Sequence, residues 1–215
     1  MTEEQLNGSR LEWYANGQMK YERNYKDGKT DGVSREWHAN GKLNREQSWK
    51  DGKRDGIYKS WYDGNPNLEQ SWKDGEKDGI WKSWYETKSR RPYYNEESYK
   101  DGKKHGIWKT WYGYGKPKSE QIWKDGKEDG VNRAWHKNGR PYYEGRLKDG
   151  EIDGIWREWH PNGKLSYESC HEYGKRGGIW RQWYENGQLS SKKSYTDRCP
   201  TNLLPFMFTH WTHTQ

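Results

Sequence analysis

Histidine and cysteine are the residues of this sequence whose spacing could build a metal or proton-transfer site. His38, His136 and His160 recur at one place in a regular pattern where tyrosine otherwise stands, which favours a structural ring over a ligand. If His136 and His160 lie two strands apart in a sheet, about 10 Å separates them, too far to share one metal without further ligands. Cys170 and His171 are adjacent and in a strand point to opposite faces. The sequence therefore predicts no metal and no cofactor.

Carboxylate pairs are the other common source of chemistry, because two carboxyl groups with different pKa values can act as general acid and general base. The sequence has 32 acidic residues, and most of them recur at the same few places in the pattern. A glutamate that is repeated along the chain opposite a lysine or arginine is explained by ion pairing rather than by catalysis. We therefore predict no catalytic residues and a protein that is not an enzyme.

Aromatic and basic residues alternate through the chain, and rings beside cations can bind single-stranded nucleic acid. The chain has 16 Trp, 17 Tyr and 39 basic against 32 acidic residues, a formal net charge of +7. Cations and carboxylates accompany each other along the whole length, which is typical of a solvated mixed surface. This disfavours nucleic acid as a partner and leaves stacking on sugar rings as a comparable alternative.

A repeat of about 24 residues arranges all of these side chains. Its eight units begin at Asn7, Asp31, Asp55, Asp78, His105, Asp129, Asp153 and Gly177. Positions are counted from these residues. Such a period predicts a repeat protein in which each unit packs mainly on its neighbours. The sequence divides into an N-terminal lead-in (1–6), one continuous repeat domain (7–198) and a C-terminal tail (199–215).

Each unit is expected to be a β-hairpin. Its β-prone halves are joined by Asn-Gly, as at Asn40 and Gly41, a pair typical of the two-residue type I′ turn with positive φ at both residues. Asp-Gly, as at Asp51 and Gly52, joins one unit to the next by the same chemistry. The predicted fold is all-β, an elongated single-layer antiparallel β-meander of eight hairpin repeats and about 16 strands.

The hairpin register predicts which residues face each other. Position 5, usually Lys or Arg, should oppose position 16, usually Glu, and position 8 should oppose position 13. The expected ion pairs are Arg35 with Glu46, Lys109 with Glu120, Arg133 with Glu144 and Arg157 with Glu168. The glycine at position 2 is expected to let a large ring lie flat over an adjacent strand.

Tryptophan at position 7 is the most regular feature of the repeat. It occupies Trp13, Trp37, Trp61, Trp84, Trp111, Trp135, Trp159 and Trp183. Only 28% of the residues are hydrophobic, and aromatic residues make up 16% of the chain, so stacked rings must replace an aliphatic core and these tryptophans are structural. The variable aromatic positions are instead the expected partner contacts: Trp81, Tyr85, Trp108, Tyr112, Trp156 and His160.

The segment Lys148–Gly163 carries Asp-Gly, Ile-Trp, Trp and Asn-Gly at their repeat positions. With them the sequence resembles the MORN-type repeat (membrane occupation and recognition nexus), and is most similar to the variant gathered under the YwqK antitoxin family. It is also similar in style to Trp-rich arrays of giant DNA viruses. The resemblance covers about nine-tenths of the chain. It implies a single-layer β-sheet that serves as an interaction scaffold, and the YwqK likeness implies neutralisation of a toxin.

Further expectations concern location and assembly. No apolar run is long enough to cross a membrane, and the first residues lack a secretory pattern. We expect a cytoplasmic protein, in the host cytoplasm or the virion if it is viral, with Cys170 and Cys199 as reduced thiols. The tail 199–215 is expected to cap the last strand or to mediate self-association, and an open sheet edge or this tail would support a homodimer.

These inferences lead to one hypothesis, a non-enzymatic repeat scaffold that binds another protein through an aromatic sheet surface. The alternative is an antitoxin or immunity-type protein that neutralises a partner toxin, and carbohydrate and single-stranded nucleic acid are less favoured ligands. Replacing Trp108 and Trp156 by Ala is expected to weaken partner binding while the fold survives.

Overall fold

The structure is a computed structural model that describes residues 6–85, 93–196 and 199. The described residues form 21 β-strands and one short 3-10 helix, and the strands follow one another as an antiparallel meander. The prediction of an all-β meander of hairpins is thereby confirmed. The chain divides into an N-terminal unit, residues 1–127, and a C-terminal unit, residues 128–215. The one continuous repeat domain stays a prediction.

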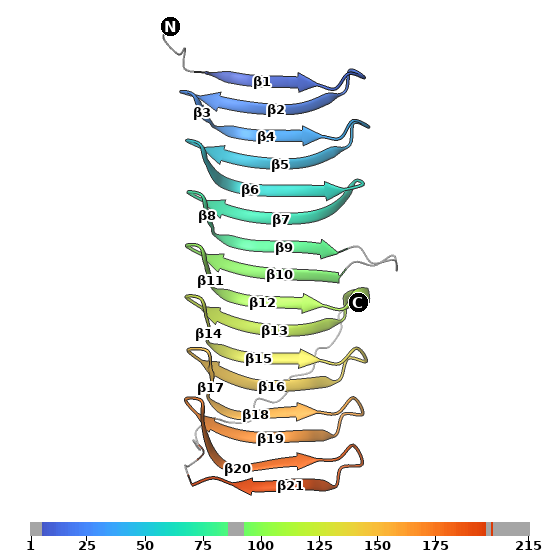
Figure 1. The fold of residues 1–215 in the computed structure, drawn as a ribbon, viewed down its shortest axis with the longest axis vertical. Helices are drawn as coiled ribbons and strands as arrows, with labels where there is room; N and C mark the ends of the chain where they lie inside the picture. The colour runs from blue at the N-terminus through green and yellow to red at the C-terminus, as the bar shows by residue number, and fades with distance from the viewer. Residues whose placement is uncertain (1–5, 86–92, 197–198, 200–215) are drawn as a thin grey trace, which may run out of the picture. The chain divides into compact units, whose positions relative to one another are not determined.

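The N-terminal unit consists of five hairpins whose strands lie side by side in chain order, from blue to green in Figure 1. Its strands are β1 (Gly8–Trp13), β2 (Met19–Lys26), β3 (Lys29–Thr30), β4 (Gly32–Trp37), β5 (Leu43–Lys50), β6 (Lys53–Tyr62), β7 (Asn65–Lys73), β8 (Glu76–Lys77), β9 (Gly79–Tyr85), β10 (Tyr93–Lys100), β11 (Lys103–Lys104), β12 (Gly106–Trp111) and β13 (Pro117–Lys124). The hairpins are β1–β2, β4–β5, β6–β7, β9–β10 and β12–β13. The 3-10 helix η1 (Gly113–Gly115) forms the tip between β12 and β13.

The C-terminal unit consists of three hairpins, β15–β16, β18–β19 and β20–β21. Its strands are β15 (Gly130–Trp135), β16 (Pro141–Lys148), β17 (Glu151–Ile152), β18 (Gly154–Trp159), β19 (Leu165–Glu172), β20 (Lys175–Trp183) and β21 (Leu189–Ser194). The short strand β14 (Lys127–Glu128) contains the division between the units. Each hairpin corresponds to one predicted repeat.

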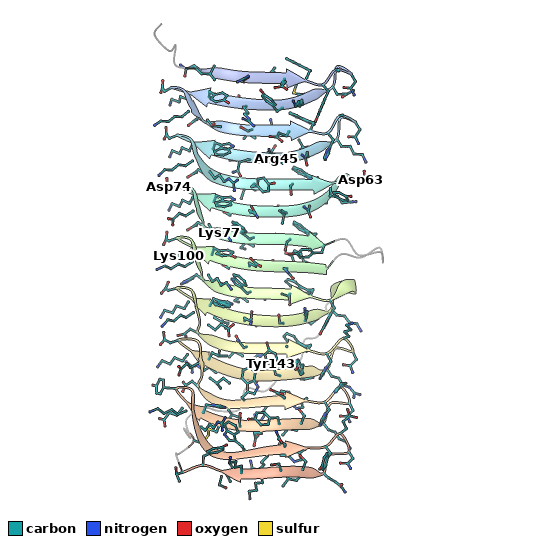
Figure 2. All side chains as sticks on the ribbon, viewed as in Figure 1. Arg45, Asp63, Asp74, Lys77, Lys100 and Tyr143 are labelled. Atoms are coloured by element: carbon teal, nitrogen blue, oxygen red, sulfur yellow. A yellow bond between two sulfur atoms is a disulfide. The ribbon has the colours of Figure 1, made fainter. Side chains whose placement is uncertain are left out.

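The turns that join consecutive repeats are of the predicted type. Asp51 and Gly52 have φ values of 49° and 81°, and the flanking Lys50 and Lys53 pair directly, as a two-residue type I′ turn requires. The aspartate at position 1 supports this turn, since the backbone N–H of Asp51 donates to Oδ2 of Asp31 at 3.2 Å. The prediction for the Asp-Gly pairs is confirmed. These turns lie at the ends of the strands, along one side of the N-terminal unit, where Asp74 is labelled in Figure 2.

The type I′ prediction for Asn-Gly at the hairpin tips is wrong. In the second repeat the backbone N–H of His38 donates to the carbonyl of Lys42, and that of Gly41 to the carbonyl of His38, both at 2.9 Å. Gly41 has a φ of 80°, whereas Asn40 has no positive φ, so the tip is a type I turn followed by a left-handed glycine. Asparagine is used because its Oδ1 accepts the backbone N–H of Lys42 at 3.0 Å, a bond that stabilises turns.

The predicted register is confirmed in the middle of the hairpins. Arg35 pairs with Glu46, Lys109 with Glu120, Arg133 with Glu144 and Arg157 with Glu168. Nearer the tip a bulge after position 6 shifts the pairing, so that position 7 opposes position 13, as Trp37 opposes Leu43. The prediction that position 8 opposes position 13 is wrong because the five-residue tip needs this bulge.

The glycines at position 2 serve a different purpose from the predicted one. All eight have positive φ, between 60° and 139°, where a side chain would be strained. The nearest side chain in the fifth repeat is a serine rather than a ring, since a Cβ on Gly106 would lie 2.9 Å from Oγ of Ser98. A ring does lie over a glycine elsewhere, at Gly145, where a Cβ would lie 2.9 Å from Cζ3 of Trp156.

Few side chains are buried, because the strands of each unit form one layer and each face packs only along itself. Among the described residues of the N-terminal unit the buried side chains are Gln47 and Ser60, both polar. In the C-terminal unit Ala134, Leu147 and Cys170 are buried, with exposed fractions of 6%, 8% and 4%. Rings packed along one face therefore carry much of the burial in the N-terminal unit.

Candidate interaction surface

Two faces of the N-terminal unit differ in chemistry because side chains alternate along each strand. Positions 4 and 19 place aromatic rings on one face, which we call the ladder face. Positions 5 and 16 place cations and glutamates on the other, which we call the ion-pair face. The ladder face is the candidate interaction surface.

An unbroken row of rings crosses the ladder face from β7 to β13. The aromatic ladder consists of Trp72, Trp81, Tyr99, Trp108 and Trp123. Successive ring centres lie 4.9, 5.2, 5.4 and 5.4 Å apart, with interplanar angles between 42° and 57°. Such tilted contacts each contribute about 0.5–1.5 kcal/mol beyond the area they bury. The ladder is thus a structural element as well as a surface.

Cations lie over the rings of the ladder. The ammonium of Lys77 (labelled in Figure 2) is 4.1 Å from the ring centre of Trp81 and 4.5 Å from that of Tyr99. Lys104 is similarly placed, at 4.1 and 4.0 Å from the last two rings of the ladder. The guanidinium of Arg54 lies 4.8 Å from the ring centre of Trp72. Each contact is a cation–π interaction, and the face combines flat rings with positive charge.

Polar groups hold these rings in place. The indole N–H groups of Trp81 and Trp108 donate to the backbone carbonyls of Ser71 and Ser98, each at 2.9 Å. The hydroxyl of Tyr99 donates to a carboxylate oxygen of Glu97 at 2.8 Å. Burial and then this bond raise the pKa of Tyr99.

The six predicted partner contacts fall in separate places. Trp81 and Trp108 are half-buried members of the ladder. Trp156 belongs to the C-terminal unit, where its ring stacks on Tyr143 with centres 4.9 Å apart and covers Gly145. The structure therefore gives all three tryptophans packing roles.

The other three predicted contacts lie near hairpin tips. Tyr85 ends β9 with 54% of its surface exposed, and Tyr112 precedes η1 as a half-buried ring. In the C-terminal unit, Nε2 of His160 lies 2.9 Å from the carbonyl oxygen of Trp183. His136 makes the same contact, at 2.8 Å from the carbonyl oxygen of Trp159. These histidines link neighbouring hairpin tips, which agrees with the structural role expected for their position.

The regular tryptophans of position 7 are half-buried, except for Trp13, which is exposed. Trp84 and Trp111 enclose the ring of Tyr94, with centres 5.5 and 4.6 Å away. This sandwich forms a second aromatic cluster within the N-terminal unit. It gives at least these two tryptophans the packing contacts that a structural role requires.

Glutamates on the ion-pair face are engaged with cations. In the N-terminal unit Arg35 lies 2.7 Å from Glu46 and 3.2 Å from Glu22, so it bridges two repeats. In the C-terminal unit Arg133 lies 3.2 Å from Glu144. Burial raises the pKa of Glu144, and Arg133 opposes that effect. Pairing thus accounts for the repeated carboxylates, as the sequence predicted for these pairs.

The prediction of two reduced thiols is wrong. Cys170 on β19 forms a disulfide with Cys199, which lies 29 residues further along the chain. The Cα atoms of the two cysteines are 5.7 Å apart. Next to Cys170, burial lowers the pKa of His171, and Nε2 of His171 lies 3.1 Å from Oγ of Ser169. In the described part of the chain no group of three or more His, Cys, Asp or Glu is placed to hold a metal ion.

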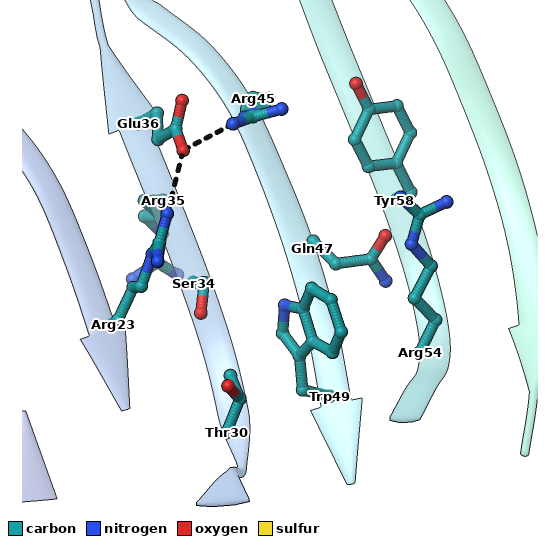
Figure 3. Close-up of a pocket in the computed structure, with 10 residues that line it drawn as sticks. All are labelled: Arg23, Thr30, Ser34, Arg35, Glu36, Arg45, Gln47, Trp49, Arg54 and Tyr58. Atoms are coloured by element: carbon teal, nitrogen blue, oxygen red, sulfur yellow. Dashed lines mark hydrogen bonds and ion pairs between the residues drawn. The ribbon is translucent and has the colours of Figure 1, made fainter. Parts of the chain in front are cut away.

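A pocket that the sequence analysis did not anticipate opens on the ladder face between β2 and β6. Figure 3 shows the residues that line it, with Trp49 and Tyr58 as its rings and Arg23, Arg35, Arg45 and Arg54 as its cations. One signal could have revealed it. Position 4 of the second repeat is Ser34 where the third, fourth and fifth repeats have an aromatic ring.

Comparison with known proteins identifies the repeat. A family model described as a MORN repeat variant matches five segments, residues 6–27, 30–51, 104–125, 152–173 and 176–197. No curated protein matches the chain. Within the described residues, no helix is long and apolar enough to cross a membrane.

Proposed function

Because this chain belongs to the MORN repeat family, whose repeats are commonly scaffolds for protein or membrane interactions, we propose that it is a non-enzymatic scaffold that binds another protein. The binding surface is the ladder face of the N-terminal unit. The partner presents acidic side chains to the cations and apolar or aromatic groups to the rings.

The observation that carries this proposal is the aromatic ladder with lysines over its rings. Trp81 and Trp108 are only half-buried, so a partner can cover more of their surface. Tryptophan, tyrosine and arginine are the residue types that dominate protein interfaces. A carboxylate approaching Lys77 or Lys104 would be paired with a cation that is already held in position by two rings.

The geometry of the ladder favours a protein over single-stranded nucleic acid. Single strands bind where bases can stack on exposed faces of aromatic rings, whereas neighbouring rings of the ladder pack on one another with centres 4.9 to 5.4 Å apart. Lys77 and Lys104 also cover ring faces on which a base would stack. The same spacing argues against sugar rings inserted between the aromatic rings.

The proposal is tested by affinity capture from the native source with quantitative mass spectrometry. The variant is the double substitution Lys77→Gln and Lys104→Gln, and the control is Lys100→Gln with Lys103→Gln, which removes the same charge from nearby exposed lysines. We expect one or more proteins to be captured at least fivefold less by the ladder variant than by the wild type or the control.

Four results would decide against the proposal or refine it. Equal capture by both variants would contradict a role of the ladder, and loss of capture after nuclease treatment would identify nucleic acid as the bridging ligand. Capture of a toxin whose activity this chain suppresses would make the interaction that of an antitoxin. A turnover that the purified chain catalyses would overturn the non-enzymatic role.

We also propose a homodimer formed through β21, which within the described residues pairs with β20 alone and whose residues are all exposed. Unpaired edge strands readily add another strand. Light scattering between 1 and about 50 micromolar should show the mass of a dimer; a monomer throughout that range would contradict it.

The proposed location is the cytoplasm, including that of a host cell if the protein is viral. The Cys170–Cys199 disulfide is more typical of oxidising compartments. Fractionation of the native source, with the thiols alkylated at lysis, would test the location and the redox state together.

A further inference from the structure

The pocket on the ladder face has the size of a small-molecule site. Its volume is about 300 Å³, at the lower end of the range for ligand pockets. It is lined from β2, β3, β4, β5 and β6, all within the N-terminal unit. Its walls combine two aromatic rings, Trp49 and Tyr58, with arginine side chains, as Figure 3 shows.

A missing ring creates this space. At position 4 the next three repeats place Tyr58, Trp81 and Trp108, and the last two of these belong to the unbroken ladder. The second repeat has Ser34 at the same position. A serine leaves the place of a planar ring unfilled beside Trp49, and a planar ligand would complete the row of aromatic groups.

The charge in the pocket is unbalanced. Arg23, Arg35, Arg45 and Arg54 line it, and Glu36 is its single carboxylate. Arg35 is already paired with Glu46 and Glu22, which do not line the pocket. Oε1 of Glu36 lies 2.5 Å from Arg45 and 3.6 Å from Arg23, so this carboxylate is shared between two of the other three guanidinium groups. The remaining charge of about +2 favours an anion, and guanidinium groups bind phosphate oxygens in pairs.

Two polar atoms of the pocket are also left without a partner. Oγ of Ser34 and Oε1 of Gln47 are buried and make no hydrogen bond. Leaving a buried polar atom without a hydrogen bond has a cost in stability. A ligand that accepts a hydrogen bond from the Ser34 hydroxyl and donates one to the Gln47 carbonyl would remove this cost, which is a reason for the site to be occupied.

We propose that this pocket binds a small phosphate monoester that carries a planar ring. The ring occupies the place above Ser34 beside Trp49, and the phosphate is held by Arg45 and Arg54. Free mononucleotides and phosphorylated tyrosine share this chemistry, and the probes below distinguish them.

The experiment is isothermal titration of the full chain with four probes. AMP and O-phosphotyrosine contain both ring and phosphate, whereas adenosine contains only the ring and inorganic phosphate only the anion. We expect AMP or O-phosphotyrosine to bind at least tenfold more tightly than adenosine and inorganic phosphate. Tighter binding of AMP would identify the ligand as a mononucleotide, and tighter binding of O-phosphotyrosine would identify it as a phosphorylated tyrosine.

Two variants locate the binding. Ser34→Trp restores the missing ring and fills the pocket, so it should abolish binding. Arg54→Gln should weaken binding at least tenfold, whereas Lys103→Gln, an equal change of charge at an exposed lysine, should leave it within twofold. Circular dichroism checks that Ser34→Trp folds, and Arg54→Gln decides the question if it does not.

The proposal is overturned if none of the four probes binds at millimolar concentration. It is also overturned if inorganic phosphate or adenosine binds as tightly as the ring-bearing phosphates. Binding that survives in Arg54→Gln and in a folded Ser34→Trp would place the ligand elsewhere and equally exclude this pocket. The partner interaction proposed above can fail without affecting any of these results, because it depends on Lys77 and Lys104.

Discussion

In the N-terminal unit five rings form an unbroken row, and none of the hydrophobic side chains described there is buried. In the C-terminal unit Ala134, Leu147 and Cys170 are buried instead, and a disulfide joins Cys170 to Cys199. Both units are built from the same repeat. The difference shows that one repeat pattern can support either an exposed stacked surface or a small buried core.

Substitutions in the sixth repeat explain the difference. Its position 4 is Asn132 and its position 19 is Leu147, so two rings of the row are missing there. Asn132 donates to Glu128 at 2.7 Å, and Gly145 lets the ring of Trp156 approach the backbone. The C-terminal unit therefore gains burial where the N-terminal unit retains an accessible surface, and we expect binding to concentrate on the latter.

The largest expected effect comes from the disulfide. Cys199→Ser should destabilise the C-terminal unit by about 2–4 kcal/mol, because the crosslink restricts the unfolded chain. Hydrogen exchange measured by mass spectrometry should show faster exchange in residues 128–196 and unchanged exchange in residues 6–85. Wild-type protein treated with a reductant should behave in the same way, and equal acceleration in both units would show that their stabilities are not separate.

Gly145→Ala should destabilise the C-terminal unit by about 1–3 kcal/mol. The added Cβ would meet the ring of Trp156 at distances below ordinary van der Waals contact, and overpacking has this cost. Urea denaturation followed by tryptophan fluorescence measures the loss. In a Trp156→Leu background the same change should cost less, and an equal cost in both backgrounds would show that the ring is not responsible.

Lys104→Gln should destabilise the N-terminal unit by about 1 kcal/mol, because the ammonium lies over two rings and each cation–π contact contributes about 0.5–1 kcal/mol. Lys103→Gln is the control, because it removes the same charge from an exposed lysine. Urea denaturation of both variants provides the comparison. Equal free energies of unfolding for the two variants would show that the cation–π contacts of Lys104 do not stabilise the unit.

The smallest effect concerns pH. Burial raises the pKa of Glu144, so the stabilisation linked to its protonated form is complete below the ordinary glutamate value of 4.5 and is lost as pH rises through the higher folded value. Glu144→Gln should remove this decline. Free energies of unfolding measured from pH 4 to about pH 8 should therefore fall less steeply in the variant, and parallel curves would contradict the raised pKa.

The sequence predicted the local features that depend on residues close together in the chain. The type I′ turn predicted for Asp-Gly requires positive φ at both residues, and the structure has positive φ at both. The pairing of Arg35 with Glu46 followed from the repeat. Asn-Gly was misassigned because Asn40 stabilises its turn through its side chain rather than through a positive φ. That choice depends on a bond to Lys42 that the dipeptide alone does not reveal.

The candidate site was predicted less completely. Trp81 and Trp108 were identified, but the lysines over their rings were not, because Lys77 and Lys104 reach the rings across neighbouring strands. The pocket was missed for the same reason. Its arginines come from four strands, and only their common position beside Ser34 makes them a site.

The amino-acid sequence by itself determined the period, the hairpins, the turns between repeats and the central register, since each depends on local backbone preference and on a repeated pattern of side chains. The tertiary structure alone decided which rings stack, which cations cover them, where a missing ring leaves a pocket and that Cys170 meets Cys199. These features join residues from different strands. Their formation depends on side-chain volume and direction across the sheet, which the spacing of residues along one strand does not specify.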